Sequence, residues 1–153
     1  MAELSRKEVI AIVAVAGRDT RLAGVDLSDL DLSELNLYGV DLLGANLDRA
    51  RLYRTRLSKA ELAWASLQEA DLELAHLHGA NFVGANLAGA NLHKAALPGA
   101  SLIGANLQGA DLRGALLGEA DLTGANLTVA RIDEETEWPE GFDLAEHWRH
   151  DLA

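Results

Sequence analysis

The chain has 153 residues, a formal net charge of −11 and no cysteine, which allows one domain with a real core and excludes disulfides and thiolate metal sites. Its composition is 49% hydrophobic but only 5% aromatic, so we expect a narrow interior of leucine and alanine. The acidic excess argues against direct nucleic-acid binding, and no apolar run approaches the roughly 18 residues of a membrane span.

The first predicted element is a short helix over residues 5–16 within an N-terminal cap, residues 1–19. Ser5 and Glu8 form an S-x-x-E capping box, and Gly17 stands where a C-cap glycine is expected. The apolar residues that share one helical face are Val9, Ile12, Val13 and Ala16. The same stretch, SRKEVIAIVAVAG, also has the basic start and apolar core of a signal peptide. Acidic residues interrupt that basic start, so we favour the structural helix.

From Thr20 onward a five-residue motif repeats without interruption, as in GANLAGANL at residues 84–92. With its leucine taken as the centre, 23 centres run from Leu22 to Ile132 at intervals of five. Residues five apart share no helical stripe and fall on opposite faces of a strand. The repeat itself must therefore be the structural unit.

Two of the five positions are reliably apolar. Besides the central leucine, the position two residues before it is Ala at 17 of the 18 sites from Ala45 to Ala130. The position just before the centre is mostly Asp or Asn, and the position two residues after it is often Gly. We expect the two apolar positions to point inward and the glycine to form a corner. Successive turns would then pair their backbone groups at sheet-like spacing.

The tandem motif A(D/N)LXX resembles the pentapeptide-repeat family over residues 20–134. The resemblance implies an all-β solenoid, a right-handed quadrilateral β-helix with four repeats per coil, so that 23 repeats form nearly six coils. Residues 20 apart would then be neighbours on adjacent coils. Two columns fit that spacing, since opposite charges on adjacent coils attract and side-chain amides can stack. They are Asp31, Arg51 and Asp71, and Asn86, Asn106 and Asn126.

Residues 135–153 are expected to form a C-terminal cap with a short helix over 143–152. Asp143 and Glu146 supply a D-x-x-E helix start. The side chains expected to cover the last coil are Trp138, Phe142, Leu144 and Trp148. In the alternative interpretation these residues form a dimer contact.

No catalytic, cofactor-binding or metal site is predicted. His76 and His78 flank a core leucine on a convex surface, where they do not converge with the further ligands that zinc requires. The glycines follow the five-residue spacing and do not form a phosphate-binding loop. The serines and threonines mostly occupy exterior positions without a pocket that excludes water. We therefore expect no enzymatic activity and no cofactor.

The stretch DRARLYRTRLSKA, residues 48–60, is rich in arginine. One interpretation is a nucleic-acid patch, for which Tyr53 is the single aromatic candidate. The favoured interpretation is pairing with carboxylates one coil away, which places Arg51 and Arg54 between two acidic pairs. These pairs are Asp31 with Glu34, and Asp71 with Glu73.

An exterior column of apolar residues is the candidate interaction surface. It consists of Leu43, Val83 and Ile103, with Ala63 in line and Trp64 beside it. An aligned apolar stripe that includes a tryptophan is typical of a protein interface. Harmless exposure of these side chains is the alternative.

The expected function is a non-enzymatic structural or protein-interaction module of the cytoplasm with an unknown protein partner. Alternatively, the chain forms a homodimer through its C-terminal end or through the apolar stripe. The family resemblance implies a second candidate, because quinolone-resistance members are acidic rods that resemble DNA and bind DNA gyrase. Here residues 75–130 contain only three acidic and two basic residues, and no loop interrupts the repeats. These departures favour the interaction module over a DNA mimic.

Overall fold

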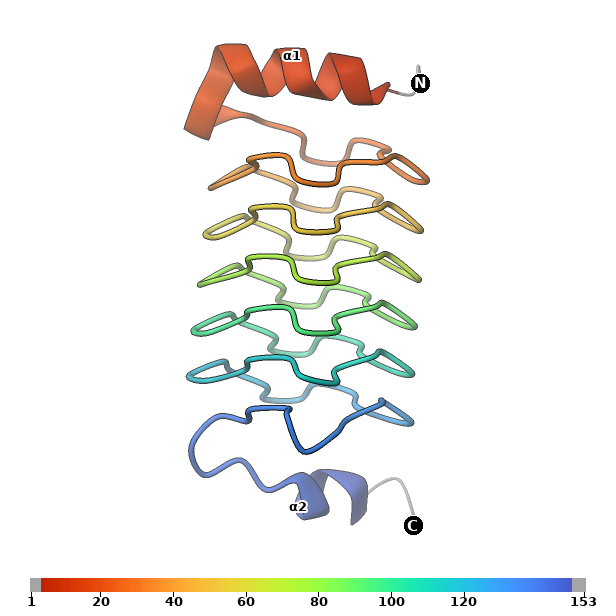
Figure 1. Cartoon of the computed structure of the whole chain (residues 1–153), viewed down its shortest axis with the longest axis vertical. Coiled ribbons are helices and arrows are strands. Elements are labelled where there is room, and N and C mark those ends of the chain that lie inside the picture. Colours follow the sequence, from red (N-terminus) through yellow and green to blue (C-terminus); the bar gives the residue numbers. More distant parts are fainter. Residues whose placement is uncertain (1–3, 150–153) are drawn as a thin grey trace.

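A computed structural model describes residues 4–149, which form a stack of coils between two helices (Figure 1). Helix α1 (Arg6–Ala16) leads through a short 3₁₀ turn, η1 (Gly17–Asp19), into the first coil. Helix α2 (Leu144–Arg149) lies at the opposite end of the stack. No helix in this part of the chain is long and apolar enough to cross a bilayer.

Helix α1 begins at a reciprocal capping box and packs one face on the first coil. The Ser5 side chain accepts a hydrogen bond from the Glu8 amide, and the Glu8 carboxylate accepts one from the Ser5 amide. Val9 is fully buried, and Ile12 and Val13 pack against the core. The first repeats carry larger residues than alanine at the inner position, and three of them are partly buried against the core: Val25, Leu30 and Leu35.

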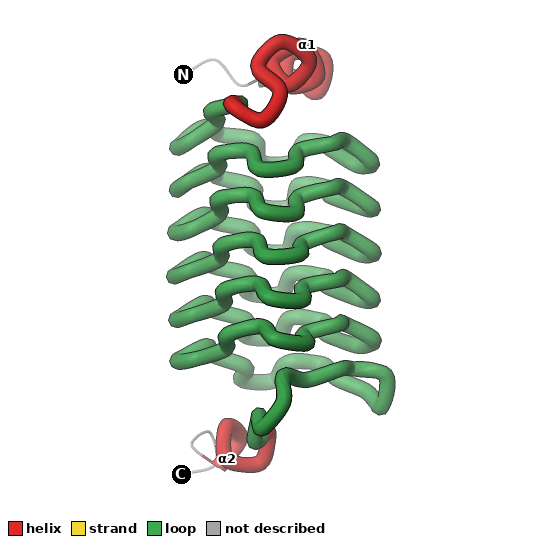
Figure 2. The backbone as a smooth tube through the Cα atoms, turned by 90° about the vertical axis from the view of Figure 1, so that its left-hand side faces the viewer, coloured by secondary structure: helices red, strands yellow, loops and turns green. Residues whose placement is uncertain are grey.

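The coils are joined by parallel bridges between residues 20 apart, such as Asn86 with Asn106. The Leu87 amide donates to the Asn106 carbonyl on the next coil (2.7 Å), and the Asn86 amide donates to the Ala65 carbonyl on the previous coil (2.9 Å). Every bridge is isolated, so residues 4–149 contain no continuous strand (Figure 2). Four five-residue repeats therefore complete one coil, and every coil satisfies the backbone groups of its neighbours.

The interior is filled by the two inward positions of each repeat. The central side chains from Leu27 to Leu117 are at most 1% exposed, including that of Phe82. Thr55 replaces an inner alanine and is also fully buried, with its hydroxyl donating to the Leu32 carbonyl (2.9 Å). The buried hydroxyl is thus satisfied, which removes the penalty of placing it among leucines.

The polar residue before each centre stabilises the turn that follows it. In most repeats its side-chain oxygen accepts a hydrogen bond from the amide two residues later, as Asn81 does from Val83 (3.0 Å). The predicted amide stack is confirmed. Asn106 donates to the Asn86 side chain (3.2 Å), and Asn126 donates to Asn106 (3.3 Å). Asp and Asn suit this position because their short side chains mimic a backbone turn.

The corner residue, two positions after each centre, has a left-handed backbone in every repeat from Leu22 to Leu127. Glycine adopts this conformation freely, but other residues lose up to about 1 kcal/mol. Eleven corners are nonetheless not glycine, among them Lys59 (φ 61°) and Trp64 (φ 59°). At these corners the sequence departs from the residue that the backbone prefers.

The ladder extends one repeat beyond Ile132, where the regular pattern of the sequence ends. Leu116 pairs with Glu137, 21 residues later, because one extra residue precedes Thr136. Thr136 takes the inner position, and its hydroxyl donates to the Leu112 carbonyl (2.9 Å). Trp138 then takes the central position of the added repeat and packs against the core. Because the extra residue interrupts the five-residue spacing, the sequence pattern does not predict this repeat.

Side chains from both terminal segments bind the outermost backbone carbonyls. The Arg6 guanidinium donates to the carbonyls of Asp31 and of Ser33, the latter at 3.0 Å. At the other end, His147 Nε2 lies 3.1 Å from the Ala125 carbonyl. Inside the stack an adjacent coil binds the corresponding carbonyls. The terminal segments therefore replace hydrogen bonds that a further coil would make.

Candidate functional site

The candidate interaction surface lies on one side of the stack, on consecutive coils. Its residues follow the central leucines of that side, and their carbonyls accept hydrogen bonds from the coil before. For example, Leu43 accepts from Gly24 (2.8 Å) and Val83 accepts from Trp64 (2.9 Å). The backbone ladder therefore fixes the spacing of the column. We call Leu43, Ala63, Val83 and Ile103, together with Trp64 at the adjacent corner, the apolar stripe.

The members of the apolar stripe differ in exposure. Trp64 is 69% exposed, Leu43 45% and Ile103 40%, whereas Val83 is half-buried and Ala63 is buried. The structure thus aligns the predicted residues and leaves three large apolar side chains open to solvent.

Trp64 lies across the corner of the next coil. A Cβ atom added to Gly84 would lie 2.3 Å from Cζ3 of the Trp64 ring, so the indole occupies the space that a side chain at Gly84 would need. Lys59 over Gly79 and Lys94 over Gly114 repeat this arrangement at other corners. At these three corners a large residue is followed by glycine 20 positions later. This spacing is the signal in the sequence that indicates the position of the Trp64 ring.

Replacement of Gly84 by alanine is expected to displace the Trp64 indole. Gly84 and Gly104 have the same φ of +65°, but a Cβ atom at Gly104 meets nothing within 4 Å. Both alanine variants should lose about 1 kcal/mol from the left-handed backbone. Only Gly84→Ala should also change the near-ultraviolet circular dichroism and fluorescence of tryptophan. Identical spectra for the two variants would contradict the packing of Trp64 on Gly84.

The predicted C-terminal residues gather below the last coil. The rings of Trp138 and Phe142 stack with centroids 4.9 Å apart, and Phe142 contacts the His147 ring at 5.0 Å. Both Trp138 and Phe142 pack against the core, and Leu144 begins α2 half-buried. The side chain of Trp148 lies outside the part that the structure describes. The Asp143 carboxylate accepts a hydrogen bond from the Glu146 amide (3.0 Å) at the start of α2.

The basic stretch pairs with carboxylates only in part. Arg49 binds Asp29 (2.8 Å) and Arg51 contacts Asp31 (3.5 Å), each one coil back, which confirms cross-coil pairing for these residues. The pairing expected for Arg54 is wrong, because its guanidinium lies over the ring of Tyr53 at 5.1 Å instead. Arg49 and Asp29 are also corner residues, so the corner position permits pairing and the difference lies in the direction that the Arg54 side chain takes.

Ion pairs and short hydrogen bonds favour the charged form of several carboxylates. The Arg113 guanidinium donates two hydrogen bonds to Asp111 (2.9 and 2.6 Å) and lowers the pKa of that carboxyl. This contribution to stability is present above the ordinary pKa of Asp and is lost as the pH falls through the lowered value. Among the residues that the structure describes, no three His, Asp or Glu side chains converge as a metal site.

Comparison with known proteins identifies the repeat. A family model described as pentapeptide repeats matches residues 18–54, 55–93 and 100–133. The chain belongs to the pentapeptide-repeat family. This confirms the predicted solenoid, a right-handed β-helix built from pentapeptide repeats.

Several solved pentapeptide-repeat proteins are similar to the chain. Rfr23 from the cyanobacterium Cyanothece 51142 is 31% identical, with a TM-score of 0.60, over 85% of this chain and 99% of that one. HetL from Nostoc sp. strain PCC 7120, involved in heterocyst differentiation regulation, is 36% identical over 72% of this chain and 56% of its own, with a TM-score of 0.31. QnrB1, a plasmid-mediated fluoroquinolone resistance protein, is 22% identical over 72% of this chain and 78% of its own, with a TM-score of 0.27. No match was found among curated proteins.

Proposed function

We propose that this pentapeptide-repeat protein is a non-enzymatic protein-interaction module that binds a partner protein through the apolar stripe. The proposal rests on the position of Trp64. Trp64 is 69% exposed, occupies a left-handed corner and lies over Gly84 beside the other apolar residues. Ten other corners that are not glycine share this left-handed backbone, so it is the exposure of a large aromatic side chain beside other apolar residues that favours a role in binding. Tryptophan is also among the residues that contribute most to interface energies.

The residues beside the apolar stripe suggest the chemistry of the partner. On the same side of the stack, the column before the central leucines reads Arg21, Asp41, Glu61, Asn81, Ser101 and Asp121. Half-buried carboxylates thus border Leu43 and Ala63, and neutral polar side chains border Val83 and Ile103. A complementary partner presents apolar side chains surrounded by lysine, arginine or amide donors.

We expect the double substitution Leu43→Lys with Ile103→Lys to abolish partner binding without unfolding the chain, since both side chains are exposed. Affinity purification from the native host, with proteins identified by mass spectrometry, measures the effect. Val129→Lys is the matched control because Val129 is 73% exposed on another side of the stack. A partner should bind the wild type and the control but not the double variant. Retention of every bound protein by the double variant would overturn the proposal.

We further propose that the stack is a quadrilateral of six coils and that both terminal segments are caps. The bridges between residues 20 apart, and the added repeat centred on Trp138, support this count. The contacts of Arg6 and His147 with outermost carbonyls support the capping role. Residues 4–19 would then close one end, and at the other end the segment 139–149, within the predicted cap of residues 135–153, would follow the added repeat. In this arrangement the sides of the stack, and not its ends, are the surfaces available to partners.

DNA mimicry toward gyrase has less support. A mimic of duplex DNA needs a continuous field of negative charge. Several basic side chains interrupt that field, because Arg54, Arg56 and Lys59 are all exposed on the second coil. The charge distribution therefore favours the interaction module.

A further inference from the structure

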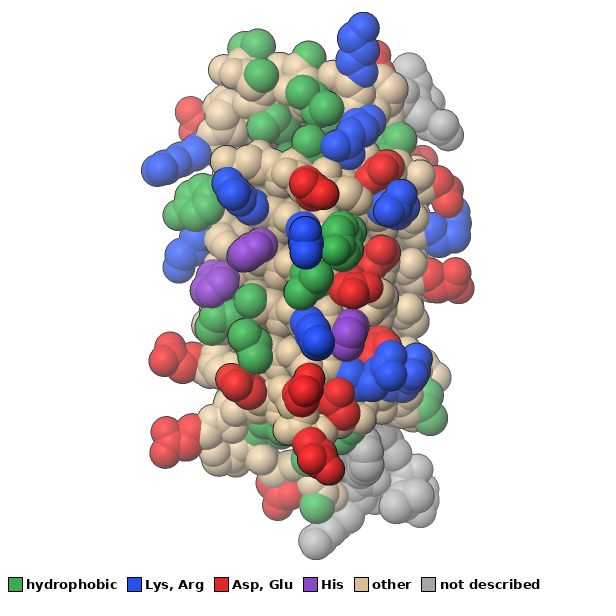
Figure 3. Space-filling model, viewed as in Figure 1, with side chains coloured by type: hydrophobic (Ala, Val, Ile, Leu, Met, Phe, Trp, Pro, Cys, Tyr) green, Lys and Arg blue, Asp and Glu red, His purple; other side chains and the backbone are tan. Residues whose placement is uncertain are grey.

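One side of the stack changes from basic to acidic along its length. Its column of bridged residues reads Asn36, Arg56, His76, Ala96, Leu116 and Glu137, from the first coil to the sixth. We call this side, with its bordering corners, the Arg56 face. Lys59 lies at a corner of its second coil, and Glu119 lies at the same corner of its fifth coil. In Figure 3 basic and acidic side chains are mixed toward the α1 end of the molecule, and acidic ones predominate near the α2 end.

Among the described residues, the cations on and around the Arg56 face have no carboxylate partner. Within residues 4–149 as far as side chains are described, no carboxylate lies within 4.0 Å of five of them. These are Arg18, Arg54, Arg56, Lys59 and Lys94. Arginines elsewhere do pair, as Arg49 does with Asp29 and Arg113 with Asp111. The described residues of the chain therefore do not neutralise these five cations by ion pairs.

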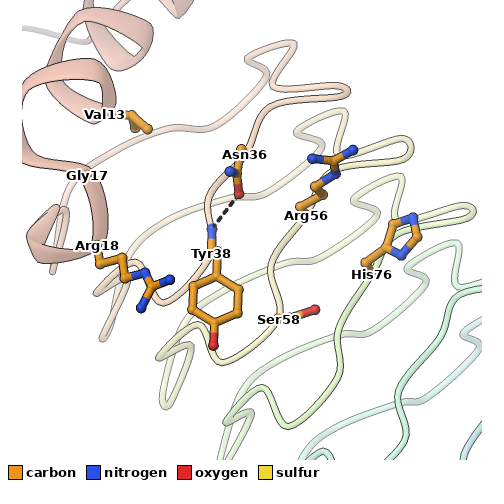
Figure 4. A pocket seen from close by; sticks show the side chains of 8 residues that line it. All are labelled: Val13, Gly17, Arg18, Asn36, Tyr38, Arg56, Ser58 and His76. Carbon is orange, nitrogen blue, oxygen red and sulfur yellow. Dashed lines mark hydrogen bonds between the residues drawn. The ribbon is translucent and has the colours of Figure 1, made fainter.

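The basic half is also concave. A cavity of about 540 Å³ lies between the end of α1 and the first coils, and its lining includes Arg18, Tyr38, Arg56 and His76 (Figure 4). The Arg18 guanidinium lies over the Tyr38 ring at 5.2 Å. A second cavity of about 400 Å³ shares Arg56 and His76, reaches Lys94 and also has Glu34 in its lining. The surface is thus shaped to receive protruding groups of negative charge.

The half of the Arg56 face toward α2 supplies such carboxylates. Leu116 is 38% exposed, and Glu119, Glu137 and Glu140 are exposed on the fifth and sixth coils. In the middle of this face the fourth coil carries small side chains, Ala96 and Pro98, whereas the third coil carries His76 and His78. The small side chains of the fourth coil allow another surface to approach closely there.

We infer that two copies of the chain pair through their Arg56 faces, with the rods antiparallel about a twofold axis between the third and fourth coils. Such an axis places the second coil of one copy against the fifth coil of its partner. Lys59 of one protomer then meets Glu119 of the other, and the contact occurs twice. Arg56 meets Leu116, which its aliphatic stem can cover. The interface is closed and symmetric, as in most soluble homodimers.

The distribution of charge favours this orientation over a parallel one. Residues 1–59 contain nine basic and nine acidic residues, whereas residues 60–153 contain four basic and fifteen acidic. A parallel pair would align the two acidic halves, and like charges in contact are unfavourable. The antiparallel pair aligns each acidic half with a half that has no net charge and that carries Arg56 and Lys59 on the paired face. The apolar stripe lies on an adjacent side of the coil and stays free for the partner proposed above.

Disulfide cross-linking tests the inference, because the chain has no cysteine of its own. Within one chain, positions 59 and 119 lie three coils apart, about 14 Å at sheet spacing, and a disulfide cannot join them. Lys59→Cys with Glu119→Cys should therefore form a covalent dimer under mild oxidation, which a reducing agent reverses. The control pair, Lys59→Cys with Glu69→Cys, should stay monomeric, because Glu69 is an exposed corner away from the Arg56 face. Equal cross-linking of both pairs, or of neither, would overturn the inference.

Charge reversal gives an independent test by analytical ultracentrifugation. Lys59→Glu and Glu119→Lys should each weaken dimerisation by about tenfold or more, and the combined variant should restore it. Higher salt should weaken the wild-type dimer, and Glu69→Lys should leave it unchanged. A wild type that stays monomeric at several hundred micromolar would overturn the inference. So would failure of the combined variant to recover, or a monomer that binds inorganic phosphate at Arg56.

Discussion

Leu87→Asp is expected to destabilise the fold by about 4 kcal/mol. Leu87 is 0% exposed and lies in the axial column of central side chains, so the substitution places a charge where it finds neither water nor a partner. Its amide donates to the Asn106 carbonyl on the next coil, and its carbonyl accepts from the Ala90 amide in the turn that follows. The free energy of unfolding, measured by chemical denaturation, should fall by this amount.

The neighbouring substitution Ala88→Asp is the control. Ala88 is the next residue along the chain but is half-buried on the exterior, so an added carboxylate can reach water. We expect a loss below about 1 kcal/mol. Comparable losses for the two variants would contradict the inward and outward assignment of the repeat positions.

Val9→Asp is expected to detach α1 from the first coil and to destabilise the chain by about 3 kcal/mol. Val9 is 0% exposed, and Ile12 and Val13 pack beside it against the core. Detachment would also release the Arg6 contact with the Ser33 carbonyl. The exposed backbone edge and leucines of the first coil should then promote association, which light scattering detects.

Val15→Asp separates this effect from a general effect on the helix. Val15 is in the same helix but is 90% exposed, so the same change of residue type should alter the melting temperature little. Association of Val15→Asp as strong as that of Val9→Asp would show that α1 does not protect the end of the stack.

The sequence predicted the features that depend on the five-residue period. The inward leucines and alanines, the glycine corners and the amide stack of Asn86, Asn106 and Asn126 follow from position in the repeat alone. They could be predicted because each coil repeats the environment of the coil before it. The repeat centred on Trp138 could not, since one extra residue before Thr136 shifts the spacing.

The candidate surface was only partly predictable. The column that contains Leu43 and Ile103 follows from residues 20 apart, and their exposure agrees with it. The direction of long corner side chains does not follow from position. Lys59 extends over Gly79 and Arg54 turns onto Tyr53, where the sequence pattern suggested carboxylate partners for Arg54. Rotamers and local packing decide these directions, so the unpaired cations of the Arg56 face emerged only from the structure.

The two terminal contacts, Arg6 at one end and His147 at the other, bind only the coil that each one touches. Neither depends on how many coils lie between them. Insertion of a further twenty-residue coil in the middle of the stack would lengthen the molecule by about 4.8 Å and leave both terminal contacts intact. The distance between surface residues on either side of the insertion can therefore change in steps of one coil, while the terminal segments keep their contacts.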